Sequence, residues 1–184
     1  MSERVQSLTS GRGLRLGAVI AIAVAAGFIA WLVFKGDDEP STPARSPAVA
    51  ASVSDLRALA KSVKHPIYWA GRKPGQTYEL TQTSSGNIYI RYLPAGIEVG
   101  VPRPDYLTVG TYPFRHPVAT LQRQAKNKGA IGGVLPNRGV LYAAGPRTPN
   151  VYLAYPNSDV EIEVFDPKPG RALRLVRSGR IVPL

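Results

Sequence analysis

The hydrophobic positions divide the chain into one unbroken apolar run and a longer stretch in which apolar and polar residues alternate. The run covers residues 16–34, nineteen residues without a charge. At 1.5 Å of rise per residue, a helix of this length spans about 28 Å, close to the ~30 Å hydrocarbon core of a bilayer. The run therefore predicts one transmembrane helix.

The residues that flank this run predict its orientation. The tail, residues 1–15, carries three arginines, whereas Lys35 is the one cation before a group of acidic residues on the other side. Because Lys and Arg favour the cytoplasmic side of a membrane, we expect a cytoplasmic tail and a C-terminal domain outside the plasma membrane. A cleaved signal peptide is the alternative, but its apolar region is only about 7–15 residues and its cleavage site follows closely. The nearest Ala-x-Ala here lies at residues 48–50.

A proline-rich segment separates the run from the remaining chain. Residues 35–51 contain Pro40, Pro43 and Pro47 and have no apolar period, which predicts a stiff linker. Residues 52–184 are then expected to form one domain. Ser52 followed by Asp55 resembles a capping box and predicts that a helix begins there, with an end before Pro66.

Further along, the period changes to two, which is typical of strands. Residues 78–83 and 87–93 flank the turn 84–86 and predict a hairpin, as do residues 150–155 and 160–165. Further strands are expected at 106–114, 131–135 and 140–144, and a helix at 117–128. Residues 171–178 suit a helix or a strand, and the regular arginine spacing from residue 171 favours the helix. Together these elements predict an α+β domain with a mainly antiparallel sheet of five to seven strands and two or three helices.

Two segments of the domain also resemble each other. Residues 87–101 and 150–164 align without a gap and are identical at five of fifteen positions. The similarity predicts the same unit in each, a strand, a reversal and a second strand. An internal duplication and two independent hairpins of similar composition both remain open.

Within the strand 160–165, Val160, Ile162 and Val164 alternate with Glu161 and Glu163. This alternation predicts one buried and one solvated face. Two carboxylates on one strand face could also serve an envelope hydrolase, since their side chains would lie about 7 Å apart. Solvated alternation is the simpler interpretation.

The composition leaves few other routes to catalysis or metal binding. There is no cysteine, and the two histidines, His65 and His116, each stand between a cation and a proline. No Gly-x-Ser-x-Gly elbow and no phosphate-binding glycine loop is present, although Gly129, Gly132 and Gly133 lie close together. We therefore expect no enzyme activity, no cofactor and no metal.

Charge gives the clearest functional signal. The chain has 23 Lys and Arg residues against 12 Asp and Glu, a net charge of +11. No acidic residue occurs between Asp105 and Asp159, whereas cations and aromatic residues do. This pattern predicts a ligand-binding basic patch formed by Arg115, Arg123, Lys126, Lys128, Arg138, Arg147 and Tyr112.

Four short strings carry a resemblance to other proteins. They are Tyr68-Trp69-Ala70-Gly71, Thr77-Tyr78-Glu79-Leu80-Thr81, Arg91-Tyr92-Leu93-Pro94 and residues 107–113. Over residues 65–115 the chain resembles uncharacterised single-pass membrane-anchored proteins of actinobacteria. The resemblance implies a bacterial cell envelope setting and no catalytic residue.

These observations favour a non-catalytic, membrane-anchored binding or scaffolding domain outside the cell. Its expected partners are the lipid bilayer, through residues 16–34, and an anionic lipid or cell-wall polymer, through the basic patch. No nucleic acid partner is expected. The alternative is a protein–protein interaction module that contacts another membrane protein through a sheet edge or through Gly17, Ala21 and Ala25, whose spacing permits close helix packing.

Overall fold

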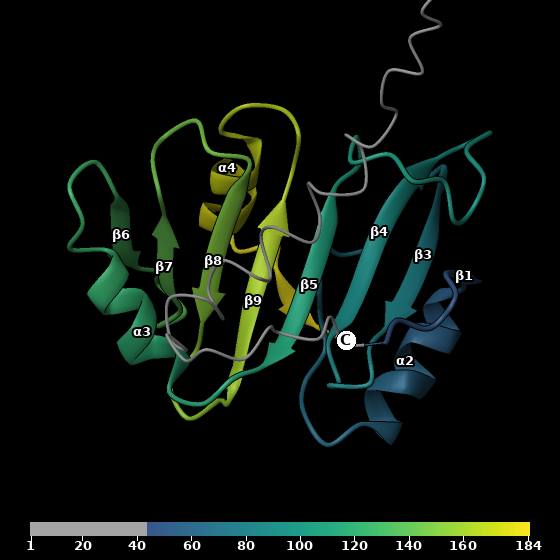
Figure 1. Cartoon of the computed structure of the whole chain (residues 1–184), viewed down its shortest axis with the longest axis horizontal. Coiled ribbons are helices and arrows are strands. Elements are labelled where there is room, and N and C mark those ends of the chain that lie inside the picture. The colour runs from purple at the N-terminus through teal and green to yellow at the C-terminus, as the bar shows by residue number, and fades with distance from the viewer. Residues whose placement is uncertain (1–43) are drawn as a thin grey trace, which may run out of the picture. The chain divides into compact units, whose positions relative to one another are not determined.

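A computed structural model describes residues 44–184 of the chain. The predicted tail, the predicted transmembrane helix and residues 35–43 of the predicted linker lie outside the described residues. Between residues 44 and 184, no helix has the length and apolarity needed to cross a membrane. The elements in chain order are β1 (Val49–Ala51), α2 (Val53–Ser62), β2 (Tyr68–Trp69), β3 (Gln76–Gln82), β4 (Ile88–Pro94), β5 (Thr108–Pro113), α3 (Pro117–Gln124), β6 (Ile131–Val134), β7 (Val140–Ala143), β8 (Asn150–Ala154), β9 (Val160–Phe165), α4 (Arg171–Arg177) and β10 (Val182–Pro183) (Figure 1).

The main sheet has eight strands in the order β1-β3-β4-β5-β9-β8-β7-β6, and every neighbouring pair is antiparallel. The predicted α+β class with an antiparallel sheet is therefore confirmed, and the described residues contain three helices. The prediction of five to seven strands in the sheet was too low because it missed β1, and it also missed β2 and β10, which form a separate sheet.

Both predicted hairpins are present. β3 and β4 pair from Gln82↔Ile88 outward, around the predicted turn at residues 84–86. β8 and β9 pair from Ala154↔Glu161 outward. Turn residues and alternation were sufficient to predict these elements because adjacent strands pair locally.

The strands that were not predicted are short and pair over long sequence distances. Three residues of the predicted linker form β1, which pairs with β3 at the edge of the sheet. β10 pairs with β2 in a second sheet of two strands, and the Leu184 amide donates to the Ile67 carbonyl at 2.9 Å. The C-terminal residues are therefore tied to the segment that follows α2.

Helices cover opposite faces of the main sheet. On one face, Leu56 of α2 and Leu173 and Val176 of α4 join the apolar core with sheet residues such as Ile90 and Ile162. On the other face, α3 packs against β7 and β8 (Figure 1). Each fully buried aliphatic side chain in such a core contributes about 1.5–3 kcal/mol.

The helix termini follow their local sequence. Ser52 accepts from the Asp55 amide and the Asp55 carboxylate accepts from the Ser52 amide, which is the predicted capping box. α3 ends at Gln124, earlier than expected, and Gly129 follows with a φ of +82°. The glycine permits the reversal into β6, because this left-handed conformation is strained for other residues.

The second face of the sheet is also buried at its centre, which corrects one prediction. Glu161 and Glu163 were expected in solvent, but they are 3% and 7% exposed. The segment 87–101 also differs from its expected form: β4 is followed by a turn and by irregular chain, whereas residues 150–164 form the complete β8–β9 hairpin. The two similar segments therefore do not form the same unit.

Substitution of Gly132 tests how closely α3 packs against the sheet. A Cβ at Gly132 would collide with the Ala125 side chain at the end of α3, whereas a Cβ at Gly133 would meet no atom within 4 Å. We expect Gly132→Ala to lower the free energy of unfolding by about 1–3 kcal/mol, as overpacking does. Gly133→Ala is the matched control and should change it little. Urea denaturation of both variants checks this, and equal effects would contradict the close packing.

Candidate functional site

All six cations of the predicted basic patch are exposed. Arg115 precedes α3, Arg123 lies on α3, and the others follow in the turns and connections around β6 and β7. Within residues 44–184, none of the six takes part in an ion pair. Their charges are therefore available to an external anion.

The structure does not gather these six cations at one point. Arg138 lies in the turn between β6 and β7, and Arg147 lies in the connection between β7 and β8. These connections are at opposite ends of β7, which places them more than about 10 Å apart. Lys128 is nearer to Arg147. The chain at Gly145 approaches the chain at Gly129 so closely that a Cβ at Gly145 would contact the Gly129 carbonyl, and these two glycines neighbour Arg147 and Lys128 in the sequence. The predicted patch is thus a dispersed basic surface.

Tyr112 has a different environment from the six cations. A Cβ at Gly110 would collide with the Tyr112 ring, so the side chain lies along β5 over that glycine. Its hydroxyl donates to Glu163 Oε2 at 2.5 Å. Tyr112 therefore belongs to a buried polar cluster, and its hydroxyl is already engaged.

This Tyr–Glu cluster lies on the second face of the sheet. Glu163 accepts from the Tyr112 hydroxyl and, at 3.3 Å, from the Tyr152 hydroxyl, while Glu161 Oε2 is buried and has no partner among the described residues. Burial, together with the charge of Glu163, raises the pKa of Glu161 to about 8. Burial also raises the pKa of Glu163, although its two tyrosine donors oppose the rise. Glu161 is therefore the carboxyl that holds a proton near neutral pH.

A buried ion pair occupies the same face nearer the other edge. Arg91 and Glu79 lie opposite each other on β4 and β3, and Arg91 Nε is 3.0 Å from Glu79 Oε1. Arg91 also donates to the Val101 carbonyl at 2.7 Å, and the Gly100 amide donates to Glu79 at 2.7 Å. The pair thereby fastens the loop after β4 to the sheet. Removing one partner of such a pair is strongly destabilising, because a buried charge is left unpaired.

Acidic residues are buried far more often than basic residues in this domain. Residues 44–184 contain eight Asp and Glu residues, of which Glu79, Glu161, Glu163 and Asp166 are buried. The same range contains nineteen Lys and Arg residues, of which Arg91 alone is buried. The protein surface is consequently more basic than the composition alone indicates.

Sequence reasoning missed a second group of cations on the α4 side of the sheet. The charges of Arg171 and Arg180 act on Lys73, whose pKa is lowered mainly by burial and further by these two neighbours. Asp166 opposes this effect, but it is buried, lies 3.3 Å from Arg171 Nε and accepts from the Lys168 amide. The regular arginine spacing from residue 171 predicted only a helix face. The proximity of Lys73 to Arg171 and Arg180 depends on tertiary structure.

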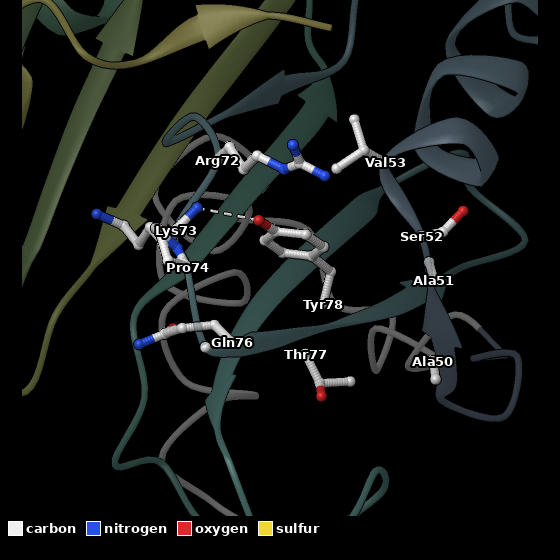
Figure 2. A pocket seen from close by; sticks show the side chains of 11 residues that line it. Ala50, Ala51, Ser52, Val53, Arg72, Lys73, Pro74, Gln76, Thr77 and Tyr78 are labelled. Carbon is white, nitrogen blue, oxygen red and sulfur yellow. Dashed lines mark hydrogen bonds between the residues drawn. The ribbon is translucent and has the colours of Figure 1, made fainter.

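A hollow of about 680 Å³ lies beside this group, between the start of α2 and the loop that joins β2 to β3 (Figure 2). Arg72 extends into it toward Val53, and the ring of Tyr78 forms part of its wall. Gln76 and Thr77 also line the hollow, with their polar groups directed outward, and no acidic residue lines it. The hollow therefore suits a partly polar ligand that carries negative charge.

Another hollow, of about 500 Å³, lies at the start of α3. Its lining includes His116, Tyr155 and Asp159 but no Lys or Arg. Because its one charged carboxyl side chain would repel an anion, it is a poor site for the ligand class that the basic surface favours. Among residues 44–184, no three His, Cys, Asp or Glu side chains lie together as metal ligands.

Comparison with known proteins adds no assignment: no family model, no curated protein and no solved structure matches the chain. The resemblance to actinobacterial membrane-anchored proteins therefore stays a prediction.

The buried Glu161 predicts how stability depends on pH. Its pKa of about 8 in the folded state exceeds its ordinary value of 4.5, so the folded protein holds an additional proton between these pH values. The free energy of unfolding should fall as pH rises through this window, by at most about 1.4 kcal/mol per pH unit, and be fully retained below it.

Glu161→Gln should flatten this decline, because the variant has no carboxyl to ionise at that position. Asp159→Asn, which removes an exposed carboxyl from the neighbouring turn, is the control. Chemical denaturation at several pH values measures the slope. A slope that is unchanged in Glu161→Gln would contradict the assignment of the proton.

Proposed function

We propose that the chain is a non-catalytic, membrane-anchored protein that binds a phosphate-bearing polymer of the cell envelope outside the plasma membrane. The observation that carries this proposal is the unequal burial of charge. Half of the carboxylates of residues 44–184 are inside the fold, whereas all cations except Arg91 remain at least partly exposed. Such a surface attracts polyanions through a field that extends about 8 Å at physiological ionic strength.

The distribution of the cations favours a polymer over a planar membrane. Arg123 lies on α3, which covers one face of the sheet, whereas Arg174 and Arg177 lie on α4, which covers the other (Figure 1). Arg138 and Arg147 extend the charge to both ends of β7. A planar lipid surface can contact only one side of such a domain. A flexible polymer chain can follow the charge around it.

The buried glutamates support a binding role more than a hydrolytic one. Glu161 and Glu163 line neither of the two hollows, and both are nearly inaccessible. Glu163 is held by two tyrosine hydroxyls, which fix it in the interior. A glycosidase needs both carboxyl groups at the scissile bond. The pair is better explained as part of the internal structure.

The predicted transmembrane anchor would determine where this binding takes place. A single transmembrane helix at residues 16–34 and a proline-stiffened linker would hold the domain near the outer surface of the membrane. Wall polymers and the lipids to which they are attached are the phosphate-rich partners within reach there. The anchor also raises the effective concentration of the domain at that surface.

Binding to a defined phosphodiester polymer tests this function. The full chain, reconstituted in nanodiscs of zwitterionic lipid, should bind poly(glycerol phosphate). Its affinity should fall at least tenfold between about 50 and 200 mM salt, as for other phosphodiester polyanions. Uncharged dextran is the control polymer.

Two results would reject the proposal. One is the absence of salt-sensitive binding to poly(glycerol phosphate). The other is binding that disappears when the nanodiscs contain anionic lipid, because the cations would then face lipid headgroups and not the polymer.

A further inference from the structure

The loop between β2 and β3 places two adjacent cations on opposite sides. In Figure 2, Arg72 extends toward Val53 and the hollow, while the Lys73 ammonium group extends away from it. The loop is held by the Lys73 amide, which donates to the Tyr78 hydroxyl at 3.0 Å. The two side chains therefore present charge to two neighbouring spaces from one fixed backbone segment.

On the Lys73 side, positive charge exceeds negative charge. Lys73 Nζ lies 5.9 Å from the centre of the Tyr92 ring. The antiparallel pairing of Val182 with Trp69 brings Arg180, two residues before Val182, beside the end of β2 and the loop that holds Lys73. The charged groups that act on the ammonium group are Arg171, Arg180 and Asp166. Asp166 is 2% exposed and already binds Arg171 and the Lys168 amide. One engaged carboxylate thus faces three cations, and an additional anion would reduce the repulsion among them.

On the Arg72 side, the hollow has the size and lining of a small-ligand site. Its volume of about 680 Å³ lies in the range that holds a sugar or polyol unit. Val53 and the Tyr78 ring offer apolar surface for carbon–hydrogen groups, and the guanidinium group of Arg72 offers hydrogen-bond donors for hydroxyls. Arg72 has no ion-pair partner among the described residues. The first turn of α2 is capped by its own Ser52 and Asp55, so the charge in the hollow comes from Arg72.

We propose that this loop is the centre at which the envelope polymer binds, and that it recognises a phosphodiester-linked polyol. One phosphate lies among Lys73, Arg171 and Arg180, the neighbouring polyol unit occupies the hollow, and Arg72 binds the next phosphate. Guanidinium groups match phosphate oxygens in geometry, and the lysine adds a point charge. This assignment rests on the proposed function, and it concentrates affinity on the α4 side, away from the patch predicted from the sequence.

Paired substitutions in the full chain test the location. Arg72→Gln/Lys73→Gln should weaken binding of poly(glycerol phosphate) about tenfold or more, since both phosphate contacts are reduced. The change leaves the backbone hydrogen bond from residue 73 to Tyr78 in place. Arg57→Gln/Lys61→Gln removes the same charge from exposed positions on α2 and is the control. The control should weaken binding about twofold at most.

A second measurement reports on Lys73 directly. NMR titration of the Lys73 side chain, with and without glycerol 3-phosphate, should show that the anion raises the pKa of Lys73, because a bound phosphate offsets the repulsion from Arg171 and Arg180. The pKa of the Lys61 side chain, on α2, should not change when glycerol 3-phosphate is added.

The outcomes separate this assignment from the broader function. If the unmodified chain binds the polymer and the two double variants weaken it equally, the loop is not the centre, although the function stands. A Lys73 pKa that does not move at saturating glycerol 3-phosphate overturns the assignment as well. If the unmodified chain fails to bind the polymer, both proposals are wrong.

Discussion

Burial of carboxylates within the antiparallel sheet is the constraint that connects the fold to the charge of the surface. On the face opposite the apolar core, Glu79 is neutralised by Arg91, Glu163 accepts from two tyrosines, and Glu161 retains a proton. A buried carboxylate requires a counter-charge, hydrogen-bond donors or protonation, and each of these three glutamates is stabilised in a different one of these ways. In every case a negative charge is removed from the surface, and most of the exposed cations among residues 44–184 are left without an ion-pair partner; Arg103 and Arg171 are the exceptions.

Local sequence was sufficient for most of the elements but not for their surroundings. The hairpins, α2 and α4 were predictable because turn residues, capping residues and periodicity act within a few positions. The burial of Glu161 was not, because it depends on the strands that flank β9, of which β5 is distant in sequence. Similarity was misleading for the same reason: Glu98 aligns with Glu161, yet Glu98 is exposed in irregular chain after β4. Equivalent positions in two similar segments met different tertiary neighbours.

The candidate site shows the same division between local and tertiary information. The absence of acidic residues between Asp105 and Asp159 predicted a basic patch, and the structure places its six cations on the surface. It gave no indication that they would disperse over both ends of β7. The group around Lys73 could not be found from the sequence, because about a hundred residues separate Lys73 from Arg171. The packing of α4 against the sheet brings the positive charges of Arg171 and Lys73 close together.

We infer that an anionic polymer binds the basic surface and does so chiefly at the loop between β2 and β3. Amide chemical-shift mapping of the isotopically labelled full chain with poly(glycerol phosphate) tests this most directly. We expect the largest shifts at residues 71–77 and around Arg171 and Arg180, with smaller shifts near Lys126 and Lys128. Shifts confined to the hollow beside Asp159, or no shifts at a saturating polymer concentration, would contradict it.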